Sequence, residues 1–224
     1  MSTIKNFLKI PIFKLIPIYY LKLVAFLGYL IITLIQFISM VYNLSNQSPI
    51  IGEIVSELRD VTVQNDRMRF RRNLERLGEI FAYEISKKLP SKTKEIQTPL
   101  GISECTVFEE QPVIATILRA GLPMHTGLLN MLDKADNGFI SAYRKHHKSG
   151  KFTIKMEYIS CPDLEEKIVI LSDPMLATGA SIVLSIKQLM EYGSPSHIHV
   201  VVAIASTVGI DEIRKNFSSE KVTV

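Results

Sequence analysis

Two turns of small residues in this sequence each follow a run of aliphatic residues, and the residue types suit the binding of phosphate and sugar groups. One turn, residues 173–181, follows the apolar run 168–171, and apolar residues recur at helical spacing after Ser181. A turn between a strand and a helix presents backbone N–H groups that bind phosphate when little side chain is in the way. Asp173, at the carboxyl end of the strand, can accept hydrogen bonds from sugar hydroxyls. The predicted site consists of Asp173, Pro174, Met175, Leu176, Ala177, Thr178, Gly179, Ala180 and Ser181.

The other turn follows the strand-like run 112–118 and consists of Arg119, Ala120 and Gly121. Open α/β sheets bind ligands at the carboxyl ends of their strands, where Arg119 is predicted to lie. A guanidinium can bind a diphosphate through two parallel hydrogen bonds, and Gly121 allows the backbone to approach it closely. Taken alone, such an arginine can also cap a helix, and glycine-containing turns are common in α/β proteins.

Both segments resemble one family. Asp-Pro-Met-Leu-Ala-Thr-Gly at the later turn resembles the phosphoribosyl-pyrophosphate (PRPP) loop of uracil phosphoribosyltransferases, and Ile-Leu-Arg-Ala-Gly-Leu-Pro-Met at the earlier turn resembles their pyrophosphate loop. The resemblance runs from about Met40 to Val224. It implies an α/β fold of the phosphoribosyltransferase (Rossmann-like) type, a mostly parallel sheet flanked by helices with a β-hairpin flap. It also implies transfer of the phosphoribosyl group from PRPP to uracil, giving UMP and pyrophosphate, with Mg²⁺ accompanying PRPP and with a homo-oligomer, a dimer or larger. Many phosphoribosyltransferases have two consecutive acids where this chain has Asp173-Pro174, and the single acid, which the uracil enzymes share, favours them over the purine branch.

A basic hairpin is predicted between the two turns. Residues 138–144 and 152–158 read as strands, and the tip between them is basic and contains a glycine, as in a mobile flap. The resemblance implies that Arg144 contacts the pyrophosphate of PRPP, so the predicted catalytic residues are Arg119, Arg144 and Asp173. We assign no metal ligand to His146 or His147.

The family also carries a Pro-Gly-Leu-Gly-Asp-x-Gly-Asp stretch that binds uracil through its backbone, and this sequence has no such stretch. The uracil-binding residues are therefore unassigned, and we expect this polypeptide, C-terminally incomplete as a family domain, to convert uracil poorly. Two alternatives stay open. One is a catalytically silent PRPP- or nucleotide-binding module, with or without a membrane tether, and the other is a regulator that binds RNA.

The charge of the chain disfavours a nucleic-acid partner. The net charge is +4, but the four lysines before Glu53 account for all of it, since 26 − 4 leaves 22 basic residues against 22 acidic ones. Cys105 and Cys161 show no paired spacing, which indicates reduced thiols of a cytoplasmic protein and neither a disulfide framework nor a zinc site.

The first 39 residues form a hydrophobic leader to a predicted phosphoribosyltransferase domain at 40–224. Residues 23–42 carry no charge and are long enough to span a bilayer. If this segment spans the membrane with its N-terminal lysines on the cytoplasmic side, the domain lies on the opposite side, where PRPP is not expected. A secretory signal fits less well, because no A-x-A-like cleavage site follows. We prefer an over-extended reading frame with a start at Met40, and expect membrane association only if residues 1–39 are retained.

The remaining elements follow from periodicity and capping. Asp66 is predicted to cap a long amphipathic helix that covers the core or a dimer partner, after an irregular lead-in with a short helix at 45–60. Residues 87–101 read as a loop, and residues 198–206 as one buried strand followed by a helix. Residues 221–224 would begin a strand at the edge of the sheet with its hydrogen-bonding groups exposed.

Overall fold

The computed structural model describes residues 22, 27–28, 40–45, 47–146 and 152–224, with side chains at all of these except 142–146 and 152–157. The chain divides into two compact units, Met1–Ser39 and Met40–Val224, and the fold described below is that of the second. Its elements in chain order are α2 (Pro49–Arg59), α3 (Arg67–Ser86), β1 (Ser91–Thr98), β2 (Gly101–Phe108), β3 (Val113–Leu118), α4 (Leu122–Met131), β4 (Asp136–His146), β5 (Phe152–Ser160), β6 (Ile168–Ser172), β7 (Met175–Leu176), α5 (Ala180–Leu189), the 3₁₀ turn η2 (Met190–Tyr192), β8 (His197–Val201), β9 (Ile204–Ala205), α6 (Thr207–Asn216) and β10 (Val222–Thr223).

The predicted leader and its candidate span at 23–42 lie mostly outside the described residues. Among the residues that are described, no helix is both long enough and apolar enough to cross a membrane.

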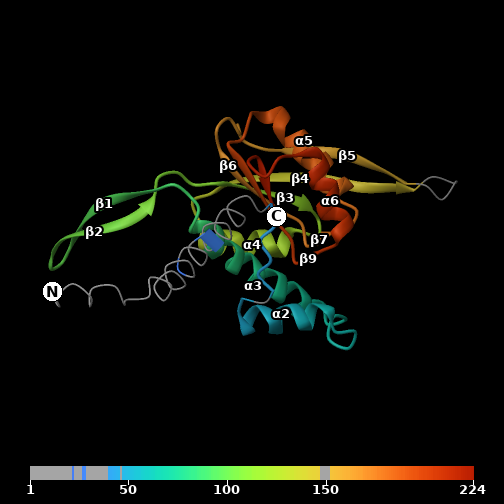
Figure 1. The fold of residues 1–224 in the computed structure, drawn as a ribbon, viewed down its shortest axis with the longest axis horizontal. Helices are drawn as coiled ribbons and strands as arrows, with labels where there is room; N and C mark the ends of the chain where they lie inside the picture. The colour runs from blue at the N-terminus through green and yellow to red at the C-terminus, as the bar shows by residue number, and fades with distance from the viewer. Residues whose placement is uncertain (1–21, 23–26, 29–39, 46, 147–151) are drawn as a thin grey trace, which may run out of the picture. The chain divides into compact units, whose positions relative to one another are not determined.

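The centre of the Met40–Val224 unit is a sheet of six strands in the described chain, ordered β10-β8-β6-β3-β4-β5. Neighbouring strands run parallel except β5, which is antiparallel to β4. Helices α3 and α4 lie on one face of the sheet and α5 and α6 on the other (Figure 1). The prediction of an α/β fold with a mostly parallel sheet is therefore confirmed.

The alternation of side chains along β3 shows why its sequence is apolar at every position except Thr116. Val113, Ala115 and Ile117 belong to the core that includes α5 and α6, whereas Ile114 belongs to the core that includes α3 and α4. A strand that is buried on both faces requires apolar residues at successive positions.

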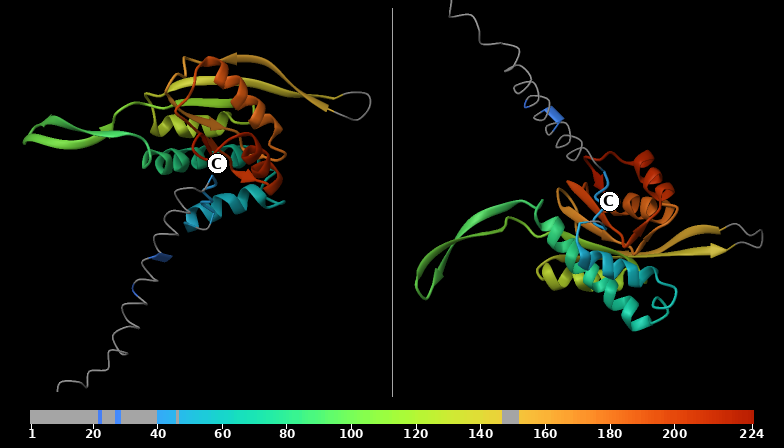
Figure 2. Two further views of the ribbon diagram at one scale, coloured as in Figure 1. Left: turned by 45° about the horizontal axis from the view of Figure 1, so that its top comes forward. Right: turned by 60° about the horizontal axis from the view of Figure 1, so that its bottom comes forward.

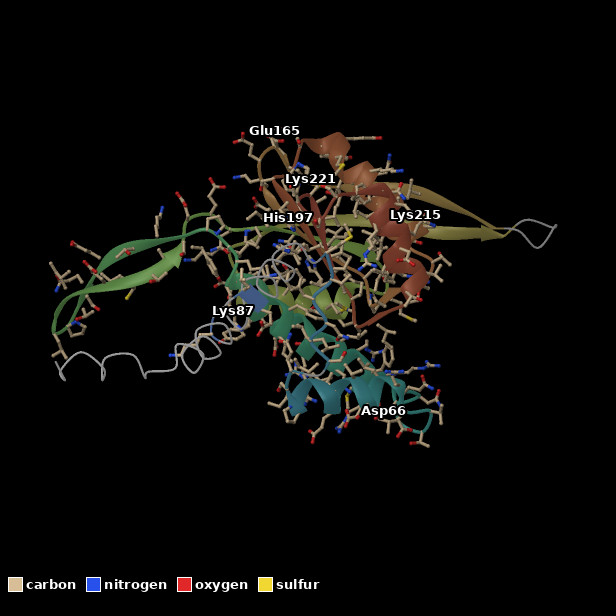
Figure 3. All side chains as sticks on the ribbon, viewed as in Figure 1. Asp66, Lys87, Glu165, His197, Lys215 and Lys221 are labelled. Atoms are coloured by element: carbon tan, nitrogen blue, oxygen red, sulfur yellow. The ribbon has the colours of Figure 1, made fainter. Side chains whose placement is uncertain are left out.

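Helix α3 begins where the capping signal predicts. The carboxylate of Asp66 accepts hydrogen bonds from the backbone N–H groups of Met68 and Arg69, each at 3.0 Å (Figure 3 labels Asp66). The predicted apolar face of the helix includes Leu74 and Leu77, which are buried against α4 and the sheet. The short helix of the lead-in is also present, as α2.

The prediction of a loop at residues 87–101 was wrong. Strands β1 and β2 form an antiparallel hairpin that extends away from the central sheet (Figures 1 and 2). The residues of β1 are almost all exposed and show no apolar alternation, so their sequence carries no strand signal. The strand conformation comes from pairing with β2, in register from Ser91 opposite Phe108 to Thr98 opposite Gly101.

The predicted single strand at 198–206 is two strands in different sheets. Strand β8 ends at Val201, and β9 pairs instead with β7. The carbonyl oxygen of Pro174 accepts hydrogen bonds from Ala203 at 3.1 Å and Ile204 at 3.2 Å, which draws the chain away from β6. The helix predicted after this segment is present as α6.

A strand at 222–223 is present as predicted, but its edge is covered in part. The N–H of Val224 donates to Met40 and its carbonyl oxygen accepts from Tyr42, each at 2.7 Å. We expected the backbone N–H and C=O groups at this edge to be exposed. For Val224 this was wrong, because Met40 and Tyr42, at the start of the domain, form hydrogen bonds with them.

Candidate active site at the carboxyl edge of the sheet

The register of the sheet brings the predicted site segments to one edge. Strands β3 and β6 are adjacent and parallel with Thr116 opposite Ser172, so the segments that begin at Arg119 and Asp173 leave the sheet side by side. On the other side of β3, Leu118 lies opposite Ser141 of β4, and Arg144 follows three residues later, opposite Ile154 of β5. The two strands of the predicted flap are present as β4 and β5, and its tip at 147–151 lies outside the described residues.

The Arg119 turn combines exposed and buried residues. Arg119 and Ala120 are exposed, and the Leu118–Arg119 peptide bond is cis. Gly121 is buried directly before α4, where a Cβ would lie 2.8 Å from the carbonyl oxygen of Ser172. Only glycine allows the two loop segments to approach this closely.

The 173–181 loop presents a small-residue surface to solvent. Ala177, Thr178 and Ala180 are exposed, and Gly179, at φ +80°, precedes the first residue of α5. Ala180 already belongs to the helix, so it needs no left-handed conformation. Asp173 is half-buried, and its Oδ1 accepts the N–H of Met175 at 3.4 Å.

Two of the predicted site residues face the core instead. The side chains of Pro174 and Leu176 are buried, and only their backbone groups can take part in a site here. Their carbonyl oxygens accept hydrogen bonds from the 203–206 segment. The side chain of Met175 is 56% exposed and that of Ser181 is half-buried.

The N-terminus of α5 differs from those of α3 and α6. Asp66 caps α3 and the hydroxyl of Ser206 caps α6, whereas in the described chain no side chain caps α5. The N–H groups of the first turn have no partner within a helix, and the helix dipole favours a negative charge beside them. This end of α5 is therefore suited to an anion such as phosphate.

Ser206 supports the loop and was not predicted as a site residue. Its hydroxyl donates to the carbonyl oxygen of Ala177 and accepts the N–H of Gly209 at 2.9 Å. It thus ties the 173–181 loop to α6. A serine directly before a helix is a typical N-cap, and that signal identifies its position but not its contact with Ala177.

A cavity of about 420 Å³ lies beside this site, between α2, α3 and the ends of β8 and β10. None of residues 119–121 and 173–181 lines it, although Ile204 and Ala205, which pair with β7, do. Among the described residues, no group of three or more His, Cys, Asp and Glu side chains is arranged to hold a metal ion, and both cysteines are free thiols.

Comparison with known proteins decides the family. The uracil phosphoribosyltransferase family model matches residues 45–224, which includes both loops and the flap. This chain belongs to the uracil phosphoribosyltransferase family. It is 51% identical over 174 residues to the uracil phosphoribosyltransferase of Porphyromonas gingivalis, which covers 78% of this chain and 81% of that protein. It is 36% identical over 180 residues to that of Pyrococcus furiosus, which covers 79% of this chain and 76% of the relative.

The fold agrees with this assignment. A solved structure of the AQ2163 protein from Aquifex aeolicus matches with a TM-score of 0.70 at 29% identity, over 82% of this chain and 84% of that one. Uracil phosphoribosyltransferases are transferases of nucleotide salvage, and this chain is a member of that enzyme family.

Proposed function

We propose that this chain transfers the phosphoribosyl group of PRPP to uracil, which gives UMP and pyrophosphate. The observation that carries the proposal is that the turns 119–121 and 173–181 leave adjacent parallel strands at the same edge of the sheet. A ligand with a diphosphate at one end and a phosphorylated sugar at the other fits this pair of turns. The curated names of the relatives give the same reaction.

Each loop has a separate role in this proposal. The N–H groups at the start of α5 bind the 5′-phosphate, and the carboxylate of Asp173 accepts hydrogen bonds from the ribose hydroxyls. Arg119, Ala120 and Gly121 bind the diphosphate, and Arg144 adds a second guanidinium from the base of the flap.

The reaction is a displacement at the anomeric carbon. A bond forms between a ring nitrogen of uracil and C1 of the ribose, and the bond from C1 to the pyrophosphate oxygen breaks. The uracil nitrogen loses its proton, and pyrophosphate leaves with the bonding electrons. Because positive charge develops on the sugar, catalysis consists mainly of orientation and charge stabilisation, and no side-chain nucleophile is required.

Mg²⁺ fits this site as a companion of PRPP. Mg²⁺ in phosphate sites is commonly held by one or two carboxylates together with the phosphates of the substrate, and Asp173 is the carboxylate within the two turns. When bound, the ion would neutralise negative charge on the leaving pyrophosphate.

We further propose that residues 40–224 act as one catalytic domain in the cytoplasm, where PRPP is made, and that two or more copies associate. The hairpin β1–β2 supports association, because it extends from the body and exposes apolar side chains on both strands and at its turn. A second copy of this chain is the partner that we infer for it.

The test is an assay of UMP formation from labelled uracil and PRPP by the full chain, beside calorimetric titration with PRPP. We expect Mg²⁺-dependent UMP formation at a low rate, since this polypeptide is expected to convert uracil poorly. PRPP binding without any UMP would contradict the transferase proposal and leave a binding module. Absence of PRPP binding in the folded protein would remove the site altogether.

A further inference from the structure

A buried chain of three polar side chains lies beneath the two turns. The hydroxyl of Thr116 on β3 is 2.7 Å from Nδ1 of His125 on α4 and 2.7 Å from the hydroxyl of Ser172 on β6. Thr116 and Ser172 are fully buried, and His125 is 5% exposed. Polar groups are costly to bury unless they are paired, so a trio of hydrogen-bonded side chains at this place calls for an explanation.

Thr116 is the member that links the other two. Its hydroxyl has a single proton, so it donates at most one of its two hydrogen bonds and accepts at least one. Burial lowers the pKa of His125, an effect that the nearby Asn137 side chain opposes only in part, so the ring is neutral at physiological pH. The second ring nitrogen, Nε2, is buried and makes no hydrogen bond of normal geometry to any residue that the structure describes. His125 therefore depends on Thr116 for its pairing.

Each member belongs to a different segment that bears on the site. Thr116 lies two residues before the end of β3, and Ser172 is the last residue of β6, directly before Asp173. His125 lies in the first turn of α4, where its N–H donates to the carbonyl oxygen of Gly121 at 2.9 Å. The trio thus joins the stems of both turns to the helix that follows one of them.

Hydrogen bonds constrain these segments in a way that apolar packing does not. The backbone ladder already sets the register of β3 and β6, and side-chain hydrogen bonds, with their narrow limits of length and angle, restrain small displacements that aliphatic contacts tolerate. A slide of β3 against β6 would change the separation between the Arg119 turn and Asp173. That separation decides whether one PRPP molecule can reach both.

We propose that Thr116, Ser172 and His125 are positioning residues that hold the diphosphate-binding turn and Asp173 at the spacing required by PRPP. This inference rests on the function proposed above. The three side chains do not contact the substrate; they act through the backbone of residues 119–121 and through Asp173.

The test compares two substitutions of Thr116. Thr116→Val keeps the shape and removes the hydroxyl, whereas Thr116→Ser keeps the hydroxyl and removes a methyl group. Because small displacements of binding groups are costly in catalysis, we expect Thr116→Val to lower kcat/KM for PRPP by about tenfold or more. Thr116→Ser should stay within about threefold of the wild type.

Ser185→Ala is the matched control. Ser185 is fully buried on α5, and its hydroxyl has no hydrogen-bond partner among the described residues, so its loss removes a buried hydroxyl without breaking a link. We expect wild-type kinetics. Ser172→Ala provides the second measurement if Thr116→Val fails to fold, and where both fold, the double variant should lose much less than the product of the single losses.

The outcomes separate this inference from the proposed function. A wild-type chain that forms UMP, with Thr116→Val as active as the wild type or no worse than Thr116→Ser, would overturn the positioning role. So would a Thr116→Val variant that loses only thermal stability. A folded wild-type chain that neither binds PRPP nor forms UMP would instead contradict the proposed function, and the inference with it.

Discussion

Gly179 meets two separate steric demands. Its φ of +80° is in the left-handed region, and a Cβ would lie 2.8 Å from the Cβ of Glu212 and 2.9 Å from the carbonyl oxygen of Gly209. The glycine therefore allows both the turn into α5 and the close contact of this turn with α6.

Gly179→Ala should lower the free energy of unfolding by at least about 1 kcal/mol, since alanine is strained at this φ and collides with α6. PRPP affinity should fall as well, because the N–H groups of the turn would move. Gly52→Ala is the control: a Cβ there meets nothing within 4 Å, and alanine favours a helix interior, so this variant should gain up to about 1 kcal/mol. Chemical denaturation and calorimetry measure both effects, and an unaltered Gly179→Ala protein would remove this account.

Arg119 is exposed, so we expect its side chain to contribute to ligand binding and little to the stability of the fold. Arg119→Ala should therefore unfold at nearly the wild-type temperature but turn over PRPP and uracil about tenfold or more slowly, because a guanidinium on the leaving group is lost. Arg214→Ala is the comparison, since Arg214 is also exposed and pairs with Asp211 on α6, outside both turns. Similar rates in the two variants would exclude Arg119 from the diphosphate site.

At the scale of elements, the attachment of β10 to β8 is short and polar. The hydroxyl of Thr223 forms hydrogen bonds with Nε2 of His197 at 2.9 Å and with Nδ1 of His199 at 2.8 Å. His197 Nδ1 also donates to the carbonyl oxygen of Glu220 at 2.9 Å, and Figure 3 labels His197 and Lys221 at this edge. Burial, the charge of His197 and the charge of Lys88 lower the pKa of His199 to about 3.

This lowered pKa predicts that the folded protein loses stability in mild acid, at pH values well above those at which carboxylates become protonated. The unfolded chain binds a proton at His199 near pH 6.5, whereas the folded chain does not until about pH 3, so stability is complete above pH 6.5 and falls as the pH falls below it. From pH 7.5 to 5.5, His199 alone should cost roughly 1 kcal/mol. Urea unfolding at the two pH values should show this loss, and His199→Gln should reduce it. An identical loss in the variant would mean that His199 is protonated in the folded state.

At the scale of the whole molecule, contacts within one domain do not explain why the β1–β2 hairpin is stable with apolar side chains exposed. Leu100 at its turn is 100% exposed and Ile102 is 70% exposed, and no residue of either strand is buried. A two-stranded hairpin is only marginally stable without a surface to pack on. A second copy of the chain would supply that surface.

The expected result in sedimentation is a dimer or larger species for the wild type. Ile102→Glu should shift the population toward the monomer, because a charge would be buried in the interface. Val61→Glu changes a residue that is 73% exposed outside the hairpin and should sediment as the wild type does. A wild-type monomer at micromolar concentration would contradict the association proposal.

The sequence by itself determined the features whose signals are local. Mostly aliphatic runs mark β3 and β6, the spacing of apolar residues marks α3, and the Asp66 carboxylate marks where that helix begins. The small residues of both turns and the two strands of the flap are likewise visible along the chain. These features depend on neighbours a few residues apart, so periodicity and capping rules are sufficient to find them.

Tertiary structure decided everything that depends on pairing between distant residues. The hairpin at 91–108 has no apolar alternation and exists through its own register, and β9 leaves β8 because its partner is β7. Leu176 lies within the predicted binding loop yet packs in the core. Thr116 meets Ser172, 56 residues away, only because β3 and β6 are aligned in parallel. Register is a property of two strands together, and a shift of one residue would turn each side chain to the opposite face.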